Sequence, residues 1–482
     1  MQYHSTRSCT PKVDSAQAVI NGLAPDGGLY MPVALPSFDW QACLQEDFFG
    51  MATRILSAFL PDIPDMVTLV ERAYTGKFTA PQLTPTVTVG DFGVLELFHG
   101  PTSAFKDVAL SMLPQLLTAA RKAKGMKEDL MILTATSGDT GKAALEGFRD
   151  VEGISICVFY PFGGVSKVQQ AQMVTQEGKN VTVCAVRGNF DDAQTGVKNI
   201  FTACQGREDV HLSSANSINI GRLAPQITYY FKAYRDLLEQ GRIQMGEEVN
   251  FAVPTGNFGD ILAGYLAKRL GLPVGKLICA SNANNVLTDF IRSGTYDRRR
   301  ELYKTQSPSM DILVSSNLER MLYLLCEDTR LVADLMEQLN TKGTYTIPAN
   351  LFEKVQQLFW AGCCDDAGAA EAIRSVWQEQ QYLCDPHTAT GWAVAKDYVN
   401  QTGDDRYMVV LSTASAYKFP TAVLEALGQE CAADEFDQME QLSRYTGTVI
   451  PKNLACLRQK KALHNSVIEK EQMLDFVLSA CK

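Results

Sequence analysis

Short apolar stretches alternate with amphipathic ones through the middle of the chain. Five stretches are almost wholly apolar and have the length of buried strands: residues 131–135, 154–159, 181–186, 250–253 and 277–280. Helical patterns follow them, one opening at the glycines of 138–141 and another ending at Gly271 and Pro273. Apolar strands without polar alternation, separated by helices, predict a parallel sheet covered on both faces.

The two ends of the chain have a different character. The first 80 residues mix proline-rich loops with one helical stretch over 49–59, whereas residues 350–400 are helical and aromatic and residues 430–482 are helical and charged. With 482 residues the chain has length for roughly three domains of ordinary size. We therefore expect an α/β centre with added segments at both ends.

The charge balance bears on the partners of this protein. The chain holds 44 Lys and Arg against 54 Asp and Glu, a formal net charge of −10, so it has no overall electrostatic attraction for nucleic acid. Hydrophobic residues make up 46% and charged residues 20%, which excludes a disordered or fibrous chain. The short basic run 298–300 is typical of a solvated surface.

The cysteines and the apolar runs indicate a compartment. The 13 cysteines show no paired CxxC spacing, and settings such as those of Cys157 and Cys184 are apolar, which is typical of reduced core residues. No apolar run approaches the roughly 20 residues of a membrane span, and the first residues lack the apolar core of a secretion signal. We expect a cytoplasmic protein without a membrane segment or a metal site.

Two glycine loops between a strand and a helix are candidate anion sites. Residues 134–141 (TATSGDTG) precede a helix, where free backbone N–H groups and the helix dipole favour negative charge, although this loop alone is better explained as a helix-capping turn. Residues 254–260 (PTGNFGD) repeat the arrangement with two glycines that let backbone approach a ligand. Two such loops in one sheet favour phosphate binding over coincidence.

A lysine near the start of a predicted helix supplies candidate chemistry. Lys106 stands in the stretch 99–107 (HGPTSAFKD) beside apolar Ala104 and Phe105, and a desolvated lysine has a lowered pKa and a free amine for Schiff-base formation. An isolated lysine is usually a surface residue, but one sheltered lysine with two phosphate-type loops fits a phosphorylated aldehyde cofactor. Thr413 follows the strand-like YMVVL and either faces the ligand crevice or caps the strand.

These motifs together resemble the threonine synthases, pyridoxal-phosphate enzymes of the tryptophan-synthase-β type. The stretches HGPTSAFKD, TSGDTG, NSINIGR, PTGNFGD and LSTA occur in the family order, and YHSTRS, GLAPDGGLYMP, SPSMDILVSSNLER and YLCDPHTATG extend the match over nearly the whole chain. The pattern is similar to the long class found in bacteria and fungi.

The resemblance implies a fold and a division of the chain. The fold would be α/β, with the two parallel-sheet subdomains of the fold-type II pyridoxal-phosphate enzymes, an N-terminal extension and a helical C-terminal tail. Residues 1–85 would form the extension, 86–430 the catalytic region, and 431–482 the tail. Within the catalytic region the small subdomain would cover about 105–225.

The resemblance also implies roles for particular residues. Lys106 would be the catalytic residue that carries pyridoxal 5'-phosphate and shuttles protons. The other cofactor-binding residues would be Asp139 near the ring hydroxyl, Thr413 at the pyridine nitrogen, and the phosphate cradle Gly256, Asn257, Phe258, Gly259 and Asp260. The substrate-binding residues would be Ser103, Ser137, Thr140, Asn216, Ser217 and Arg222. Arg222 suits a phosphate because its planar fork gives bidentate, charge-assisted hydrogen bonds.

The implied reaction converts O-phospho-L-homoserine and water into L-threonine and phosphate, the last step of threonine biosynthesis. The small-molecule substrate would be the partner, with no nucleic acid or membrane, and the chain would act as a monomer or a homodimer. Two alternatives stay open: a related phospho-lyase or dehydratase of the same fold, and a non-catalytic relative that binds the cofactor.

One stretch departs from the family pattern. Where the family commonly reads TAHPAKF, residues 413–419 read TASAYKF, so Ser415 and Ala416 replace a histidine and a proline. The change affects the expectation for this loop more than the reaction class. For the histidines that remain, His99 and His387, a structural hydrogen bond and a ligand contact are equally good interpretations.

Overall fold

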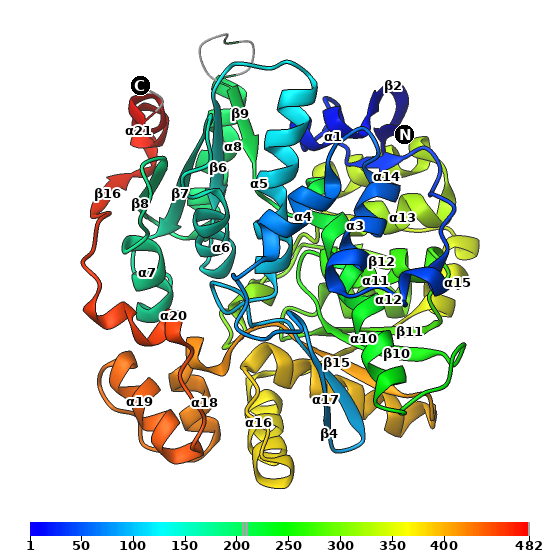
Figure 1. Cartoon of the computed structure of the whole chain (residues 1–482), viewed down its shortest axis with the longest axis vertical. Coiled ribbons are helices and arrows are strands. Elements are labelled where there is room, and N and C mark those ends of the chain that lie inside the picture. Colours follow the sequence, from blue (N-terminus) through cyan, green and yellow to red (C-terminus); the bar gives the residue numbers. More distant parts are fainter. Residues whose placement is uncertain (205–206, 208–210, 481–482) are drawn as a thin grey trace.

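Two sheets lie side by side and the long helix α5 (Lys106–Ala123) runs between them, as the computed structural model shows (Figure 1). The structure describes residues 1–204, 207 and 211–480. Lys106 is thus the first residue of the helix at the centre of the molecule. The helix predicted after HGPTSAFKD is confirmed.

The smaller sheet has five parallel strands in the order β16-β8-β7-β6-β9. Its strands are β6 (Leu130–Ala135), β7 (Ile154–Pro161), β8 (Val181–Arg187), β9 (His211–Ser214) and β16 (Ser466–Glu469). The helices α6 (Asp139–Phe148), α7 (Lys167–Val174) and α8 (Phe190–Ala203) follow the first three strands. The strands predicted at 131–135, 154–159 and 181–186 are therefore confirmed, and β16 adds a strand from the C-terminal segment to the edge of this sheet.

The larger sheet has six strands in the order β14-β11-β10-β15-β5-β4. They are β4 (Thr86–Val89), β5 (Phe92–Glu96), β10 (Val249–Pro254), β11 (Val274–Ser281), β14 (Phe359–Cys363) and β15 (Met408–Ser412). All neighbours are parallel except β4 and β5, which form an antiparallel hairpin at the edge. The strands predicted at 250–253 and 277–280 are confirmed as β10 and β11, two central strands. The expectation that one sheet holds both glycine loops is wrong, because loop 134–141 follows β6 of the smaller sheet and loop 254–260 follows β10 of the larger one.

Smaller elements surround the two sheets. The N-terminal segment forms a three-stranded antiparallel sheet of β1 (Gln2–Ser5), β2 (Ser8–Asp14) and β3 (Tyr30–Pro32), and β12 (Thr295–Asp297) pairs with β13 (Thr344–Thr346). The N-terminal helices are α1 (Ser15–Asn21), α2 (Trp40–Cys43), α3 (Phe48–Phe59) and α4 (Met66–Tyr74). The central helices are α9 (Ile220–Leu223), α10 (Ile227–Glu239), α11 (Gly259–Arg269), α12 (Val286–Ser293), α13 (Leu318–Cys326), α14 (Thr329–Lys342), α15 (Ala349–Leu358), α16 (Asp366–Gln380) and α17 (Pro386–Thr402). The last helices are α18 (Pro420–Ala426), α19 (Glu435–Thr446), α20 (Lys452–Ala455) and α21 (Met473–Ala480).

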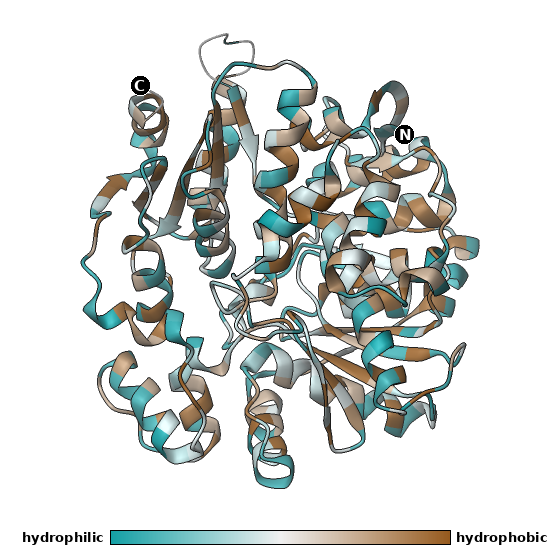
Figure 2. Cartoon of the chain, in the orientation of Figure 1, coloured by the Kyte–Doolittle hydropathy of each residue, from teal (hydrophilic) through white to brown (hydrophobic). Residues whose placement is uncertain are grey.

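The core explains why the strands were readable from the sequence. Central strands of both sheets carry brown, hydrophobic stretches in Figure 2, and every residue of β10 and β15 is buried. Parallel strands with helices on both faces bury both sets of side chains, so apolar residues run on without alternation. The pattern that predicts these strands is therefore a direct result of two-sided burial.

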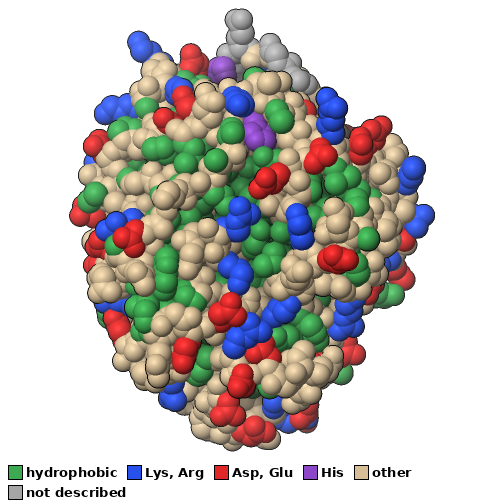
Figure 3. Space-filling view, turned by 90° about the vertical axis from the view of Figure 1, so that its right-hand side faces the viewer, with side chains coloured by type: hydrophobic (Ala, Val, Ile, Leu, Met, Phe, Trp, Pro, Cys, Tyr) green, Lys and Arg blue, Asp and Glu red, His purple; other side chains and the backbone are tan. Residues whose placement is uncertain are grey.

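The surface carries both signs of charge. On the face shown in Figure 3, Lys and Arg side chains are interspersed with Asp and Glu. Among the described residues, no helix is both long enough and apolar enough to cross a membrane.

The contact between α5 and α6 gives a test of the packing. A Cβ added at Gly147 of α6 would lie 2.0 Å from the backbone oxygen of Leu110 in α5, which neither helix can relieve by turning a side chain. We expect Gly147→Ala to lower the free energy of unfolding by about 1–3 kcal/mol, the usual cost of overpacking. Urea unfolding followed by circular dichroism measures it.

Gly368→Ala in α16 is the matched control. Its Cβ would meet the Sγ atom of Cys364, the end of a side chain that can turn away. The free energy of unfolding of this variant should therefore not fall, and can rise by up to roughly 1 kcal/mol, the preference of a helix for alanine over glycine. Equal unfolding midpoints for the two variants would contradict the close packing of α5 on α6.

Candidate active site

The candidate site lies where segments at the carboxyl ends of strands from both sheets approach the start of α5. Thr413 follows β15, and its carbonyl oxygen accepts the Phe105 N–H at 2.8 Å. The Ser415 N–H donates to the carbonyl oxygen of Ser103 at 3.1 Å. These backbone bonds bring the stretch 99–107 against the end of a central strand, the usual position of ligand sites in α/β sheets.

Lys106 is enclosed and has few polar neighbours. Its Nζ atom donates a hydrogen bond to Ser309 Oγ at 3.2 Å and lies 3.9 Å from Asp139 Oδ2. Burial lowers the pKa of Lys106 to about 8, because the cost of removing the ammonium from water outweighs the attraction of Asp139. The sheltered lysine expected from the sequence is therefore present, and a lowered pKa frees part of its amine near neutral pH.

Asp139, the first residue of α6, is held between two lysines. Its Oδ1 atom lies 2.7 Å from Nζ of Lys418, whose side chain is fully buried, and it accepts a bond from Gln169 Nε2 at 3.0 Å. Burial alone would raise the pKa of Asp139, but the charges of Lys418 and Lys106 outweigh it and hold that pKa well below its usual range. Asp139 is thus a fixed negative charge beside Lys106.

The stretch before α5 is shaped by Asp107. The Asp107 carboxylate accepts bonds from the Thr102 backbone N–H at 2.8 Å and the Thr102 hydroxyl at 2.5 Å. Ser103 has φ 58°, a left-handed conformation that is uncommon for a non-glycine residue and often marks a functional loop. The side chain of Asn453, in α20, donates to Ser103 Oγ at 2.9 Å and to the Pro101 carbonyl oxygen at 2.8 Å. The C-terminal segment therefore supports the loop that holds Ser103.

The loop of residues 254–260 closes tightly between β10 and α11. A Cβ on Gly256 would lie 2.6 Å from the carbonyl oxygen of Ser309, so only glycine fits at this position. Phe258 has φ 60°, and the carbonyl oxygen of Asn257 accepts the backbone N–H and Nδ2 of Asn317, both at 3.1 Å. The strained turn is thus pinned by a segment about 60 residues further along the chain.

The Asp260 side chain, in the first turn of α11, is buried rather than exposed at the surface of the loop. Its Oδ1 atom accepts the hydroxyls of Tyr229 at 2.6 Å and Tyr230 at 3.1 Å, while its Oδ2 atom is buried without a hydrogen-bond partner. Burial raises the pKa of Asp260 to about 6. The carboxyl group therefore anchors α11 to α10, and one of its oxygens stays available.

Arg222, in α9, is a buried cation without a carboxylate partner among the described residues. It donates to the carbonyl oxygen of Ala215, its Nε atom has no partner, and burial lowers its pKa to about 10. A buried guanidinium with unused donors is well suited to bind an anion.

The remaining predicted residues surround these groups to different degrees. The Ser217 carbonyl oxygen accepts Asn317 Nδ2 at 3.2 Å, which places it beside the loop of Gly259. Ser137 and Thr140 flank Asp139 at the start of α6, and Asn216 lies in the turn between β9 and α9. The side chains of Ser137, Thr140, Asn216 and Thr413 make no hydrogen bond within the part of the chain that the structure describes, so they are not committed to the fold.

Three residues of the site were not among the sequence-derived candidates: Ser309, Lys418 and Asn453. His387 lies next to the site, where its Nε2 atom accepts the Ser309 N–H at 3.2 Å, whereas His99 pairs with Glu96 Oε2 at 2.7 Å. Ser309 and Lys418 lie in stretches that match the family, and Asn453 lies in the tail, but nothing in the sequence pairs these three residues with the site around Lys106.

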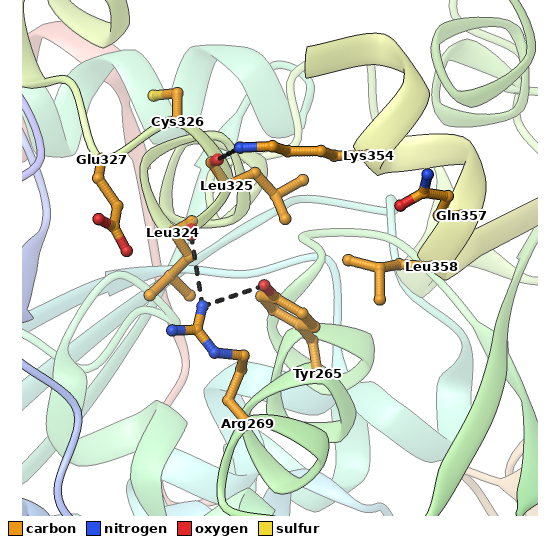
Figure 4. Close-up of a pocket in the computed structure, with 9 residues that line it drawn as sticks. All are labelled: Tyr265, Arg269, Leu324, Leu325, Cys326, Glu327, Lys354, Gln357 and Leu358. Atoms are coloured by element: carbon orange, nitrogen blue, oxygen red, sulfur yellow. Dashed lines mark hydrogen bonds between the residues drawn. The ribbon is translucent and has the colours of Figure 1, made fainter. Parts of the chain in front are cut away.

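A separate surface pocket has no part in this site. It has a volume of about 390 Å³ and lies between α11, α13 and α15. In Figure 4 the Arg269 guanidinium points to Tyr265 and Leu324, and the Lys354 ammonium points to the Leu325 carbonyl oxygen. Its cations are occupied by the protein itself, so this pocket does not compete with the site around Lys106.

Three family models match the chain in succession. The threonine synthase N terminus matches residues 2–74, the pyridoxal-phosphate dependent enzyme family matches residues 74–413, and the threonine synthase C-terminal family matches residues 388–468. Together they span the N-terminal sheet, both central sheets and most of the C-terminal segment.

Curated proteins give the same result. The chain is 38% identical over 480 residues to the threonine synthase of Pseudomonas aeruginosa, with 97% of this chain and 99% of the relative covered. It is 40% identical over 445 residues to the threonine synthase-like 1 protein of Homo sapiens, with 87% of this chain and 59% of that relative covered. The chain thus spans about 59% of the length of these threonine synthase-like 1 relatives.

Solved structures confirm the expected fold class. A pyridoxal-phosphate-bound threonine synthase from Brucella melitensis superposes with a TM-score of 0.89 at 37% identity, and both chains are covered completely. The yeast threonine synthase superposes with a TM-score of 0.88 at 33% identity, with 99% of this chain and 98% of that chain covered. The two parallel-sheet subdomains are those of the fold-type II pyridoxal-phosphate enzymes.

The two neighbours of Asp139 predict opposite shifts in the titration of Lys106. Asp139→Asn removes the negative charge that favours the Lys106 ammonium, so the pKa of Lys106 should fall below about 8. Lys418→Met removes a like charge, so that pKa should rise. The pH dependence of Lys106 labelling by an amine-reactive reagent, followed by peptide mass spectrometry on cofactor-free protein, measures both.

Lys122 on the exposed face of α5 is the internal control, because its labelling should titrate identically in all three proteins. Shifts of the same sign in the two variants would contradict the electrostatic arrangement.

Proposed function

Because the chain belongs to the threonine synthase family of pyridoxal-phosphate-dependent enzymes, we propose that it converts O-phospho-L-homoserine and water into L-threonine and phosphate. The observation that carries the proposal is the enclosed Lys106 beside the tight loop of Gly256, with Arg222 buried without a carboxylate partner. This would be the last step of threonine biosynthesis.

The residues present fit pyridoxal phosphate. Lys106 offers an amine of lowered pKa, and the turn at Gly256 leaves no room for a side chain beside the proposed phosphate cradle. Thr413 carries an uncommitted hydroxyl at the end of β15. We propose that Lys106 holds the cofactor aldehyde, that residues 256–260 hold its phosphate, that Asp139 lies at its ring hydroxyl, and that Thr413 faces its pyridine nitrogen.

The cofactor, when bound, supplies an electron sink that stabilises negative charge at the substrate's α carbon. Lys106 Nζ removes the proton from that carbon and later returns one. Its titration near neutrality suits both directions, since proton transfer is most efficient when the pKa of the acid–base group lies close to the working pH. Asp139 and Lys418 fix the charges around it, so Lys106 changes protonation state in a constant field.

Arg222 is proposed to hold the substrate phosphate, and the uncommitted hydroxyls of Ser137 and Thr140 are proposed to join Ser103, Asn216 and Ser217 at the carboxylate and phosphate. Removal of the phosphate group requires that its developing charge be stabilised, which a buried guanidinium does well. Exclusion of bulk water would protect the reactive substrate while one water is added.

The proposal needs no second chain, because all of the named residues come from one. We propose that the tripartite division at residues 85 and 430 separates the extension, the catalytic region and the tail. A cytoplasmic location is also proposed, because the twelve cysteines among the described residues form no disulfide with one another, as expected in a reducing compartment; Cys481 lies outside the described residues.

Lys106→Ala tests the central claim. The variant should lose the visible absorbance of the lysine-bound cofactor and essentially all turnover, whereas Lys122→Ala on the same helix should keep both. Threonine and inorganic phosphate should appear in equal amounts when the parent enzyme receives O-phospho-L-homoserine. Release of 2-oxobutyrate instead would favour the dehydratase or phospho-lyase alternative, and no bound cofactor would favour a non-catalytic relative.

Arg222→Gln tests the phosphate site. Loss of a hydrogen bond to a charged group costs about 1.5–3 kcal/mol, so the KM for O-phospho-L-homoserine should rise about 10- to 100-fold. Inhibition by inorganic phosphate should weaken in parallel. Arg242→Gln, at an exposed arginine, should change neither. If the KM of the Arg222 variant matched that of the parent, the phosphate would be bound elsewhere.

A further inference from the structure

A serine from a distant segment is the direct hydrogen-bond partner of Lys106. Ser309 Oγ accepts the bond from Lys106 Nζ at 3.2 Å, within hydrogen-bond range, whereas the nearest oxygen of Asp139 is 3.9 Å away and outside it. In the described part of the chain, Nζ makes no other hydrogen bond. The direction of the Lys106 amine is therefore set by a neutral hydroxyl, while Asp139 supplies charge from a greater distance.

Ser309 also packs against the loop proposed to hold the cofactor phosphate. It is the middle residue of a short 3-10 helix, Pro308–Met310, and its carbonyl oxygen closes over Gly256. Ser315 Oγ, beyond the same turn, donates to the Gly256 carbonyl oxygen at 2.7 Å. One segment thus contacts the lysine and the glycine loop at once, which couples the position of the two groups.

A buried histidine holds the Ser309 backbone. The Ser309 N–H donates to His387 Nε2 at 3.2 Å, and His387 Nδ1 lies 2.6 Å from Asp385 Oδ2. Since Nε2 accepts, the ring proton is on Nδ1 and is donated to the Asp385 carboxylate. Both side chains are almost completely buried, and the ring of Phe419 packs edge-on against the imidazole at 5.0 Å. The imidazole is therefore fixed in tautomer and in orientation.

The other Asp385 oxygen completes the support. Asp385 Oδ1 accepts the Thr388 N–H at 3.1 Å and also the Thr388 hydroxyl, so the carboxylate is fully engaged at the start of α17. On its other side, the 3-10 helix is tied by Asn282, whose Nδ2 donates to Ser307 Oγ at 3.0 Å. The segment is thus anchored before Ser309 by Asn282 and at Ser309 itself by His387.

We propose that Ser309 is a positioning residue for the Lys106 amine during proton transfer, and that Asp385 and His387 act through it by fixing its backbone. The inference rests on the proposed function of Lys106. With Lys106 charged, Nζ donates to Ser309 Oγ; with Lys106 neutral, the Ser309 hydroxyl turns and donates to the lone pair of Nζ. One hydroxyl therefore holds the direction of the amine in both protonation states. An ionised carboxylate in its place would hold only the ammonium, because it has no proton to donate to the neutral amine.

Ser309→Ala should slow the chemical step and leave substrate binding intact. We expect kcat to fall roughly 10- to 100-fold, the usual effect of misplacing a group that transfers a proton, while the KM changes less than about threefold. Ser309→Cys keeps the volume but is a poor hydrogen-bond acceptor and should behave as the alanine variant does, whereas Ser309→Thr, which retains the hydroxyl, should recover part of the rate. Ser293→Ala, at an exposed serine of α12, is the control.

Titration of Lys106 in the cofactor-free protein gives a second readout that does not depend on turnover. A hydrogen bond from an ammonium is stronger than one to a neutral amine, so Ser309 favours the charged form and its loss should lower the pKa of Lys106. Labelling of Lys106 against pH, with Lys122 as internal reference, measures the shift. An unchanged midpoint together with kcat within twofold of the parent in both Ser309→Ala and Ser309→Cys would overturn the proposal.

A double-mutant cycle tests the part played by His387. His387→Phe keeps the ring but removes the acceptor, and His387→Gln can return an acceptor oxygen. We expect the phenylalanine variant to reproduce the kcat and labelling changes of Ser309→Ala, the glutamine variant to be milder, and the combined Ser309→Ala/His387→Phe protein to be no worse than Ser309→Ala alone. Fully additive losses would show that His387 does not act through Ser309 and would overturn that part.

The outcomes separate this inference from the proposed function. If Lys106→Ala retains multiple turnovers, the function assigned to Lys106 fails, whatever the Ser309 variants do. If Lys106→Ala is inactive and the Ser309 variants match the parent in kcat and in labelling, the function stands and only the positioning role fails.

Discussion

The site depends on one charged arrangement buried where the two sheets meet. Asp139 opens a helix of the small sheet, Lys106 opens the helix between the sheets, and Lys418 follows the last strand of the large sheet. The carboxylate lies 2.7 Å from one ammonium and 3.9 Å from the other. Removing these groups from water is costly unless they are paired, so the three elements are held in one relative position.

The centre holds an uncompensated cation inside an acidic protein. Lys106 and Lys418 face the Asp139 carboxylate, whereas the buried Arg222 guanidinium has no carboxylate partner among the described residues. An anionic ligand would pair with that guanidinium. The net charge of −10 is therefore no obstacle to phosphate binding, because the local field and not the total charge acts on the ligand.

The N-terminal segment and the tail support this centre from outside. Arg7 forms an ion pair with Glu319 at 2.8 Å, and the next residue, the buried Arg320, donates to the carbonyl oxygen of Tyr30 at 3.2 Å. Arg320 also binds Asn317 Oδ1 at 2.6 Å, and Asn317 pins the turn at Asn257. The extension therefore reaches the proposed phosphate loop through two intermediate residues. Asn453, in the C-terminal segment, supports the loop of Ser103 through a direct hydrogen bond to Ser103 Oγ.

The features that could be predicted from the sequence are those that leave a pattern within a short stretch of the chain. Buried parallel strands are continuous apolar runs, and loops 134–141 and 254–260 carry glycines at fixed offsets, so both were readable. The strand β16 was not, because its residues are mostly exposed and have no hydrophobic pattern. The contacts of Ser309 with Lys106 and His387 could not be predicted either, because they join residues some 80 to 200 positions apart, which one sequence does not pair.

The departure from the family pattern at residues 415–417 does not remove the contacts that this stretch makes with the site. The contact that this stretch makes with the site is the Ser415 N–H on the Ser103 carbonyl oxygen, a backbone bond that a histidine at this position would also make. Lys418, which keeps the family's lysine, makes the side-chain contact with Asp139. Tyr417 adds a hydroxyl bonded to Thr448 Oγ1 at 2.7 Å, a further tie to the C-terminal segment that bears Asn453. The loss of histidine and proline therefore leaves the Ser103 and Asp139 contacts in place, and the imidazole next to the site is His387.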